Sequence, residues 1–293
     1  MNVIEARNLV RYYGGARGVA GLDLDVPEGS VMGLLGLNGS GKTTAIKLAL
    51  GLLVPNSGTA TLWGQDSVEL PAALRARIAY VADEVDLPGW MTLKEGMNLY
   101  ASYYPKWDSA YANSLIERFG LSMAKRYAAL SKGQKRRFFL CLALAQQPDL
   151  IVLDETAGGL DPVIRREFLD VLIEARSERD VTILFSSHIL SDVERIVDRV
   201  AFVSDGRCLL QGDLDELKGE VKRLCIPESA DSSLIRQRFT VVSENVIGGT
   251  RQLHVAGFHP SRLVGIDCEI EHLNLEDIFL AYHANTKRAE VQV

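Results

Sequence analysis

The sequence has no long apolar run and no visible export signal. Its most apolar stretches, such as residues 31–35 and 150–153, are far shorter than the roughly 20 residues of a membrane-spanning helix. The first seven residues have no basic start that leads into an apolar segment, so we expect no signal peptide. If the protein serves a membrane process, we expect it to do so from outside the bilayer.

Cysteine and positive charge are also in short supply. The four cysteines form no Cys-x-x-Cys pair, and the five histidines show no zinc-ligand spacing with them. This pattern is typical of reduced, structural thiols in a cytosolic protein. The net charge of −6 disfavours an anionic membrane surface and predicts no nucleic-acid partner.

The composition is that of a folded chain with a substantial core. It has 293 residues, 47% hydrophobic and 24% charged, which suits one large domain and a smaller one. Residues 1–215 alternate short apolar runs with amphipathic stretches, which predicts an α/β core with a mainly parallel sheet. Residues of about 85–147 have a helical pattern and are expected to form an inserted subdomain. Residues 216–293 predict a small α+β accessory domain.

Two local patterns give sharper expectations about the second half of the chain. Asp205-Gly206 separates two apolar runs and predicts a two-residue hairpin turn. Near the C-terminus, apolar residues recur at helical spacing and Asn274 is a candidate cap. That helix would present one apolar face, made of Leu275, Ile278, Phe279 and Tyr282.

Polar residues follow three of the predicted buried strands. Residues 31–35 run into a glycine-rich turn, 150–153 into two acids, and 181–185 into Ser-Ser-His. Open α/β sheets place their ligands at the carboxyl ends of the strands. The sequence therefore predicts a site at this edge.

The glycine-rich turn matches the phosphate-binding loop pattern G-x-x-x-x-G-K-[ST]. Its glycines allow backbone amides to surround phosphate oxygens, and the following helix offers its positive N-terminal end. A lysine in the loop reaches the β- and γ-phosphates, and a threonine hydroxyl ligates magnesium. The pattern predicts an ATP and Mg²⁺ site with these residues: Gly36, Leu37, Asn38, Gly39, Ser40, Gly41, Lys42, Thr43 and Thr44.

Asp154 and Glu155 close the second of these strands. The first acid is placed to hold magnesium and the second to polarise an attacking water as general base. The alternative is a pair of solvated acids at a strand end, which the neighbouring phosphate loop disfavours. His188 follows the third strand and is expected to hydrogen-bond the γ-phosphate; the alternative for this lone histidine is a structural role.

The segment Leu130-Ser131-Lys132-Gly133-Gln134 precedes a helical run. Alone it indicates a capped helix start. Together with the other motifs it resembles the signature sequence of ATP-binding cassette (ABC) proteins, usually L-S-G-G-Q, with Lys132 at the third position. The resemblance covers residues 1 to about 215 and keeps the family's motif order, including Gly159-Leu160-Asp161 for the D-loop.

The resemblance implies the remaining roles. Tyr13, with Tyr12 as its rival, would stack on adenine, while Lys42, Glu155 and His188 would be catalytic. Two cassettes would pair head to tail, so that Ser131, Gly133 and Gln134 contact ATP bound to a partner ATPase subunit. This subunit would be an identical or a related chain.

The resemblance also implies a transport ATPase that drives a separate integral membrane permease. We expect it to lie in the cytoplasm against the inner face of the cell membrane and to serve export. A soluble cassette ATPase acting on ribosomes or DNA is the alternative, disfavoured by the single cassette and the acidic charge. A non-hydrolysing regulatory subunit is disfavoured by the intact Lys42, Asp154, Glu155 and His188.

One position departs from the family pattern. Asp83 ends the strand-like run 78–82 where the family has a glutamine that touches magnesium. A carboxylate there is expected to ligate Mg²⁺ and to alter the metal dependence or the coupling. A second feature is the basic run Lys135-Arg136-Arg137, which predicts a solvated helix face, with contact to a partner or to acidic lipid as the alternative.

Overall fold

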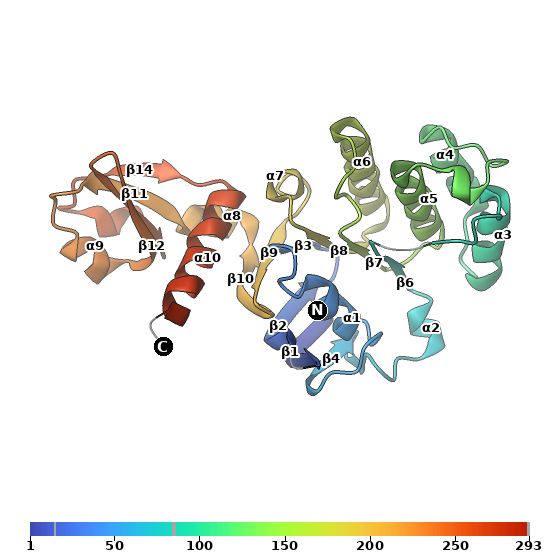
Figure 1. Cartoon of the computed structure of the whole chain (residues 1–293), viewed down its shortest axis with the longest axis horizontal. Coiled ribbons are helices and arrows are strands. Elements are labelled where there is room, and N and C mark those ends of the chain that lie inside the picture. Colours follow the sequence, from blue (N-terminus) through green and yellow to red (C-terminus); the bar gives the residue numbers. More distant parts are fainter. Residues whose placement is uncertain (15, 84–85, 292–293) are drawn as a thin grey trace.

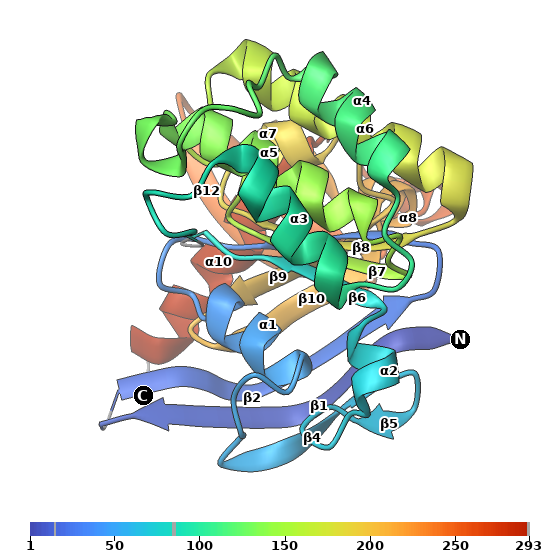
Figure 2. The same cartoon turned by 90° about the vertical axis from the view of Figure 1, so that its right-hand side faces the viewer.

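The computed structural model describes residues 1–14, 16–83 and 86–291. Three sheets organise this part of the chain. The first is antiparallel with strand order β2-β1-β4-β5, and its strands are β1 (Asn2–Tyr13), β2 (Ala16–Pro27), β4 (Ser57–Leu62) and β5 (Gln65–Asp66). It forms the lowest layer in Figure 2.

The second sheet is the centre of the molecule, with strand order β10-β9-β3-β8-β7-β6. Its strands are β3 (Val31–Leu35), β6 (Ile78–Val81), β7 (Leu150–Asp154), β8 (Thr182–Ser187), β9 (Arg199–Ser204) and β10 (Arg207–Asp213). All neighbours pair in parallel except β9 and β10. Every residue of β3, β7 and β8 is buried, as expected for parallel strands covered on both faces.

Helices cover both faces of this sheet. Helix α1 (Lys42–Ala49) lies between it and the antiparallel sheet, and Ile46 packs there with Leu24 and Leu184. On the other face lie α3 (Leu93–Tyr103), α4 (Ser109–Arg118), α5 (Lys132–Ala145), α6 (Pro162–Arg179) and the short α7 (Leu190–Val193). The elements within residues 86–147 are helical: α3, α4 and α5, with the 3₁₀ turn η1 (Tyr127–Ala129) before α5. The predicted start of this subdomain, residue 85, lies outside the described residues.

The last part of the chain forms a separate antiparallel sheet of order β12-β13-β11-β14, at the left in Figure 1. Its strands are β11 (Lys222–Pro227), β12 (Thr240–Ile247), β13 (Thr250–Ala256) and β14 (Glu269–His272). Short helices accompany it: α8 (Leu214–Glu220), α9 (Ser233–Arg238) and η2 (Pro260–Leu263); the remaining short helix, α2 (Ala72–Arg75), precedes β6. The sequence predicted α+β character for residues 216–293 without defining the individual strands of this sheet.

Helix α10 (Leu275–Val291) links this sheet to the hydrophobic core of the central sheet. The Oδ1 atom of Asn274 accepts a hydrogen bond from the Asp277 backbone N–H at 2.8 Å, which confirms the predicted cap. Phe279 meets Phe202 of β9 edge to face, with ring centroids 5.4 Å apart. The predicted apolar face of this helix therefore packs on the central core. Within the described residues, no helix is both long and apolar enough to cross a bilayer.

Because Phe279 is only 1% exposed, Phe279→Ala should lower the free energy of unfolding by about 3–5 kcal/mol. Its neighbour Leu280 is 51% exposed, so Leu280→Ala should cost no more than about 1 kcal/mol. Urea denaturation followed by circular dichroism measures both. Equal losses in the two variants would contradict the packing of α10 on β9.

Candidate active site

The loop between β3 and α1 has a backbone that only glycine suits at two positions. Gly41 has φ of 102°, and a Cβ atom there would lie 2.4 Å from the carbonyl oxygen of Gly18. A Cβ on Gly36 would lie 2.3 Å from the carbonyl oxygen of Val203. The backbone N–H of Gly206, in the β9–β10 turn, donates to the carbonyl of Ser40 at 2.9 Å. Neighbouring strands thus hold the loop in place, and no side chain caps the start of α1. The backbone N–H groups at the start of α1 are therefore free to bind an anion.

Lys42 is the buried cation of this loop, only 4% exposed. Its Nζ donates to the carbonyl oxygens of Gly36 at 2.8 Å and Leu37 at 3.1 Å. Nζ also lies 2.9 Å from Oε1 of Glu155, across the sheet edge. The ammonium group is therefore matched by a carboxylate and by two carbonyl oxygens of the loop.

Asp154, the last residue of β7, collects three hydroxyl groups. Its Oδ1 accepts hydrogen bonds from Ser186 Oγ at 2.7 Å and Thr43 Oγ1 at 3.1 Å. Its Oδ2 lies 3.4 Å from the hydroxyl of Tyr80. Burial, followed by the charge of Asp154, raises the pKa of Tyr80, which keeps this phenol protonated as a donor.

Glu155 lies between two groups from different strands. Its Oε2 is 2.6 Å from Nδ1 of His188, while Oε1 faces Lys42. Its backbone has φ of 53°, a left-handed conformation that is uncommon for a residue with a side chain. Ser186 Oγ accepts the Glu155 backbone N–H at 3.0 Å and helps to hold it. The Glu155 carboxylate points into the site and contacts Lys42 and His188, contrary to the alternative of two solvated acids.

Thr43 and Asp154 together offer oxygen ligands of the kind that Mg²⁺ prefers. The described residues contain no group of three His, Cys, Asp or Glu side chains that would enclose a metal alone. A magnesium ion here would take its other ligands from nucleotide phosphates and water, as is usual for Mg²⁺ in nucleotide sites. The residues present fit such an ion.

Comparisons with known proteins agree with this geometry. The sequence model of the family described as ABC transporter matches residues 19–158. The ABC transporter ATP-binding protein YtrB of Bacillus subtilis is 34% identical over 79% of this chain and 79% of its own. The daunorubicin/doxorubicin resistance ATP-binding protein DrrA of Streptomyces peucetius is 34% identical over 74% of this chain and 67% of its own. A solved ATP-binding subunit of an ABC transporter superposes with a TM-score of 0.67, at 29% identity, over 74% of this chain and 92% of that one.

The chain belongs to the ABC transporter ATP-binding proteins. It is an ATPase subunit that binds and hydrolyses ATP for transport. Its fold is that of the family's cassettes, with the parallel sheet and phosphate loop described above.

In this ABC protein Tyr13 lies near Thr44, at the end of the phosphate loop. A Cβ on Gly18 would lie 2.7 Å from the Tyr13 ring and 3.3 Å from the methyl group of Thr44. Tyr13 is half-exposed, and the Arg11 guanidinium lies over its ring, 5.5 Å from the centroid. Tyr12 is tied by its backbone N–H to Asn56 Oδ1 on the neighbouring loop.

The signature segment lies at the start of α5 and forms a reciprocal cap. Ser131 Oγ accepts the Gln134 N–H at 3.2 Å, and Gln134 Oε1 accepts the Ser131 N–H at 3.1 Å. A Cβ on Gly133 would lie 3.5 Å from Leu160, beside the D-loop. Asp161 caps α6 by accepting the Val163 N–H at 2.9 Å. Among the described contacts, none joins the signature to Lys42, Asp154 or Glu155 of the same chain.

The structure pairs the Asp83 carboxylate with Arg136. It shows no contact of Asp83 with Asp154, the other predicted Mg²⁺ ligand, among the described residues. An Asp83 oxygen lies 2.6 Å from Arg136 Nη2, on the second turn of α5. The side chain of Arg136 is only 7% exposed and that of Arg137 is 14% exposed. The expectation of a solvated face for this basic run is therefore wrong for both residues, because α5 is packed against α3, α4 and β6.

Two site residues carried no assigned role in the sequence. Ser186 was visible only as part of the polar end of a buried strand, and Tyr80 lay inside an apolar run. The parallel register of β7 with β8 places Ser186 beside Asp154, and that of β6 with β7 places Tyr80 beside Val152. Both side chains therefore reach Asp154 only through strand pairing.

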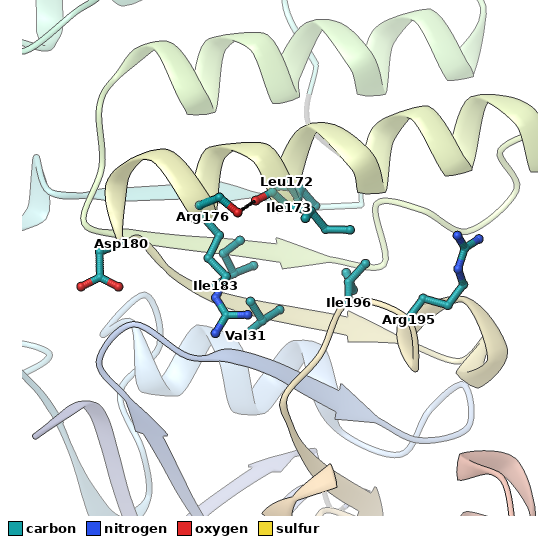
Figure 3. Close-up of a pocket in the computed structure, with 9 residues that line it drawn as sticks. Val31, Leu172, Ile173, Arg176, Asp180, Ile183, Arg195 and Ile196 are labelled. Atoms are coloured by element: carbon teal, nitrogen blue, oxygen red, sulfur yellow. Dashed lines mark hydrogen bonds between the residues drawn. The ribbon is translucent and has the colours of Figure 1, made fainter. Parts of the chain in front are cut away.

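A separate pocket of about 390 Å³ lies near the amino ends of β3 and β8. Figure 3 shows its lining, in which Leu172 and Ile173 of α6 lie near Val31 and Ile183. Arg176 at its edge is 2.5 Å from Asp198. This pocket is at the opposite end of the strands from the phosphate loop and is not part of the ATP site.

Ser186→Ala should lower kcat for ATP roughly ten- to hundred-fold, because Glu155 and Asp154 lose the hydroxyl that orients both. The KM for ATP should stay within about two-fold, since the hydroxyl contacts that the structure describes for Ser186 are to Glu155 and Asp154 and not to the phosphate loop. A steady-state ATPase assay measures both constants. The matched control is Ser177→Ala on the exposed face of α6, and equal kcat in the two variants would contradict the assignment.

Proposed function

We propose that the ATP site consists of the residues gathered at the carboxyl edge of the sheet. Lys42 and the loop N–H groups bind the phosphates. Thr43 and Asp154 hold a Mg²⁺ ion that neutralises the remaining negative charge of the phosphates. Glu155 acts as general base on the attacking water, and His188 bonds both Glu155 and the γ-phosphate. Tyr13 stacks on the adenine.

The observation that carries this proposal is the position of Glu155 between Lys42 at 2.9 Å and His188 at 2.6 Å. A general base must lie within hydrogen-bond reach of the water it activates, beside the group under attack. In this proposal Lys42 binds the phosphates, so its neighbour Glu155 would lie beside the γ-phosphate. Phosphate oxygens would replace the loop carbonyls as partners of the Lys42 ammonium.

We further propose that this site is completed by a second cassette, either another copy or a related chain. The signature segment forms no described contact with the phosphate loop of its own chain, although Ser131 is exposed at the start of α5. The helix start there offers backbone N–H groups to an anion. Ser131, Gly133 and Gln134 would contact the partner's ATP, and Asp161 would lie at the interface between the cassettes.

The closing and opening of this pair would drive a separate integral membrane permease in the direction of export. Support for export comes from DrrA, which is an ATP-binding protein of drug resistance. Such a subunit would act in the cytoplasm at the inner face of the cell membrane. In this proposal residues 1–215 form the cassette, with an inserted helical part at about 85–147, and residues 216–293 form an accessory domain.

The paired site predicts complementation between two inactive variants. Lys42→Met removes the phosphate-loop cation, and Ser131→Arg blocks the signature, so each variant alone should lose at least about 90% of its ATPase activity. A mixed pair carries one intact site, made of the loop of the Ser131→Arg chain and the signature of the Lys42→Met chain. An equimolar mixture should therefore regain activity, measured as phosphate release.

A control mixture of Lys42→Met with Asp154→Asn should stay inactive, because both changes damage the same half of the site. If the first mixture also remained inactive, this chain would not pair with itself in the proposed head-to-tail manner.

The transport role predicts a membrane partner. Mild detergent extraction and affinity capture of the tagged chain from its own cells should recover a multi-span membrane protein in near-stoichiometric amount, identified by mass spectrometry. Recovery of ribosomal or DNA-repair proteins without any membrane protein would contradict the permease proposal and leave the ATPase assignment intact.

A further inference from the structure

Asp83 lies at the edge of the ATP site but is turned away from its centre. Strand β6 pairs in parallel with β7, with Val81 opposite Leu153. Asp83 and Glu155 each follow their paired residue by two positions, Asp83 after Val81 and Glu155 after Leu153. The backbone of Asp83 therefore leaves the sheet beside the acids of the site. The described contact of its carboxylate is nevertheless the Arg136 guanidinium, 2.6 Å away on α5.

Arg136 depends on this partner. Its side chain is 7% exposed, and its Nε and Nη1 atoms are buried with no hydrogen-bond partner among the described residues. A buried guanidinium with so few acceptors is held in place by its single carboxylate. The carboxylate, being about half-exposed, is the movable member of the pair.

The charge of Asp83 matters because the backbone of this residue lies beside the proposed Mg²⁺ site. A free carboxylate at the exit of β6 would face the Mg²⁺ that Thr43 and Asp154 are proposed to hold, and would add a negative charge beside the γ-phosphate. An ion pair with Arg136 cancels that charge and keeps the oxygen atoms on the α5 side.

We propose that Arg136 is a positioning residue that holds Asp83 out of the magnesium shell and joins the exit of β6 to the signature helix. This inference rests on the proposed Mg²⁺ site. Asp83 is thus not a metal ligand while Arg136 is present, which replaces the simpler expectation that it substitutes for a metal-binding glutamine. This ion pair links the helix that Ser131 caps to the end of the strand beside the proposed metal site, in addition to the direct packing of α5 on β6.

The test measures metal affinity directly rather than turnover. Mn²⁺ serves as a paramagnetic substitute for Mg²⁺, and free Mn²⁺ is counted by electron paramagnetic resonance in the presence of a non-hydrolysable ATP analogue. The variants are Arg136→Gln, Asp83→Asn and the double variant. Arg137→Gln is the matched control, because it removes a neighbouring guanidinium of α5 that contacts the Phe119 carbonyl instead.

Releasing the carboxylate in Arg136→Gln should tighten Mn²⁺ binding about five-fold or more, the scale of one added charge near the ion. The double variant, which removes both charges, and Arg137→Gln should stay within about two-fold of the parent chain. Asp83→Asn leaves the Arg136 cation unpaired and should weaken Mn²⁺ binding by no more than about five-fold. Arg136→Lys, which keeps a cation for Asp83, should restore the parent affinity if the ion pair is what matters.

Two results would overturn the inference. One is a folded Arg136→Gln chain with unchanged Mn²⁺ affinity. The other is Mn²⁺ binding that is weaker in the double variant than in the parent chain, which would make Asp83 a ligand in the parent chain. The double variant leaves no buried charge without its partner, so this result decides the question even if Arg136→Gln does not fold. Failure of the proposed function looks different: Mn²⁺ and the analogue would then bind the parent chain no better than Lys42→Met.

Discussion

Lys42 and Glu155 form an ion pair that is largely withdrawn from water, with Lys42 only 4% exposed. Buried charges are tolerated when they are paired and their remaining donors are bonded, since an unpaired charge in this environment costs several kcal/mol. Here the loop carbonyls and His188 supply the additional partners. The rest of the site is arranged around this balance: Asp154 next to Glu155 takes three hydroxyl groups, and each of these comes from a different element.

The layers of the fold explain why so many polar groups meet at one edge. Strands β3, β7 and β8 are buried along their whole length, so their polar residues are displaced to their ends. Parallel pairing puts those ends on the same side of the sheet. The antiparallel sheet and α1 close one face, and helices α3–α6 close the other (Figure 2). This packing buries Lys42 and Asp154, and charges withdrawn from water interact more strongly with a nucleotide.

Local patterns predicted the parts of this site that lie within one segment. The glycine-rich loop, the two acids at the end of β7 and the Ser131 cap depend on neighbours in sequence, and the structure has all three where the sequence placed them. Contacts between strands were beyond such patterns, which is why the role of Ser186 became visible only in the fold.

The basic run on α5 shows most clearly where prediction from local sequence patterns fails. Lys135-Arg136-Arg137 has the composition of a solvated face, but Arg136 is buried because α5 packs against α3, α4 and β6, and the end of β6 presents Asp83 to it. The predicted helix at the C-terminus shows the opposite case. Its apolar spacing was strong enough to identify the face that packs on β9, although not the sheet that it packs beside.

ATP hydrolysis is proposed to depend above all on Glu155 as the base that activates water, and Glu155→Gln tests this role most directly. The amide keeps the shape of the side chain but cannot accept a proton, so ATP hydrolysis should fall at least about 100-fold. Binding of a fluorescent ATP analogue should remain within a few-fold of the parent chain, while Glu178→Gln on the exposed surface of α6 should change neither quantity. A Glu155→Gln chain that hydrolyses ATP at the parent rate would contradict the account.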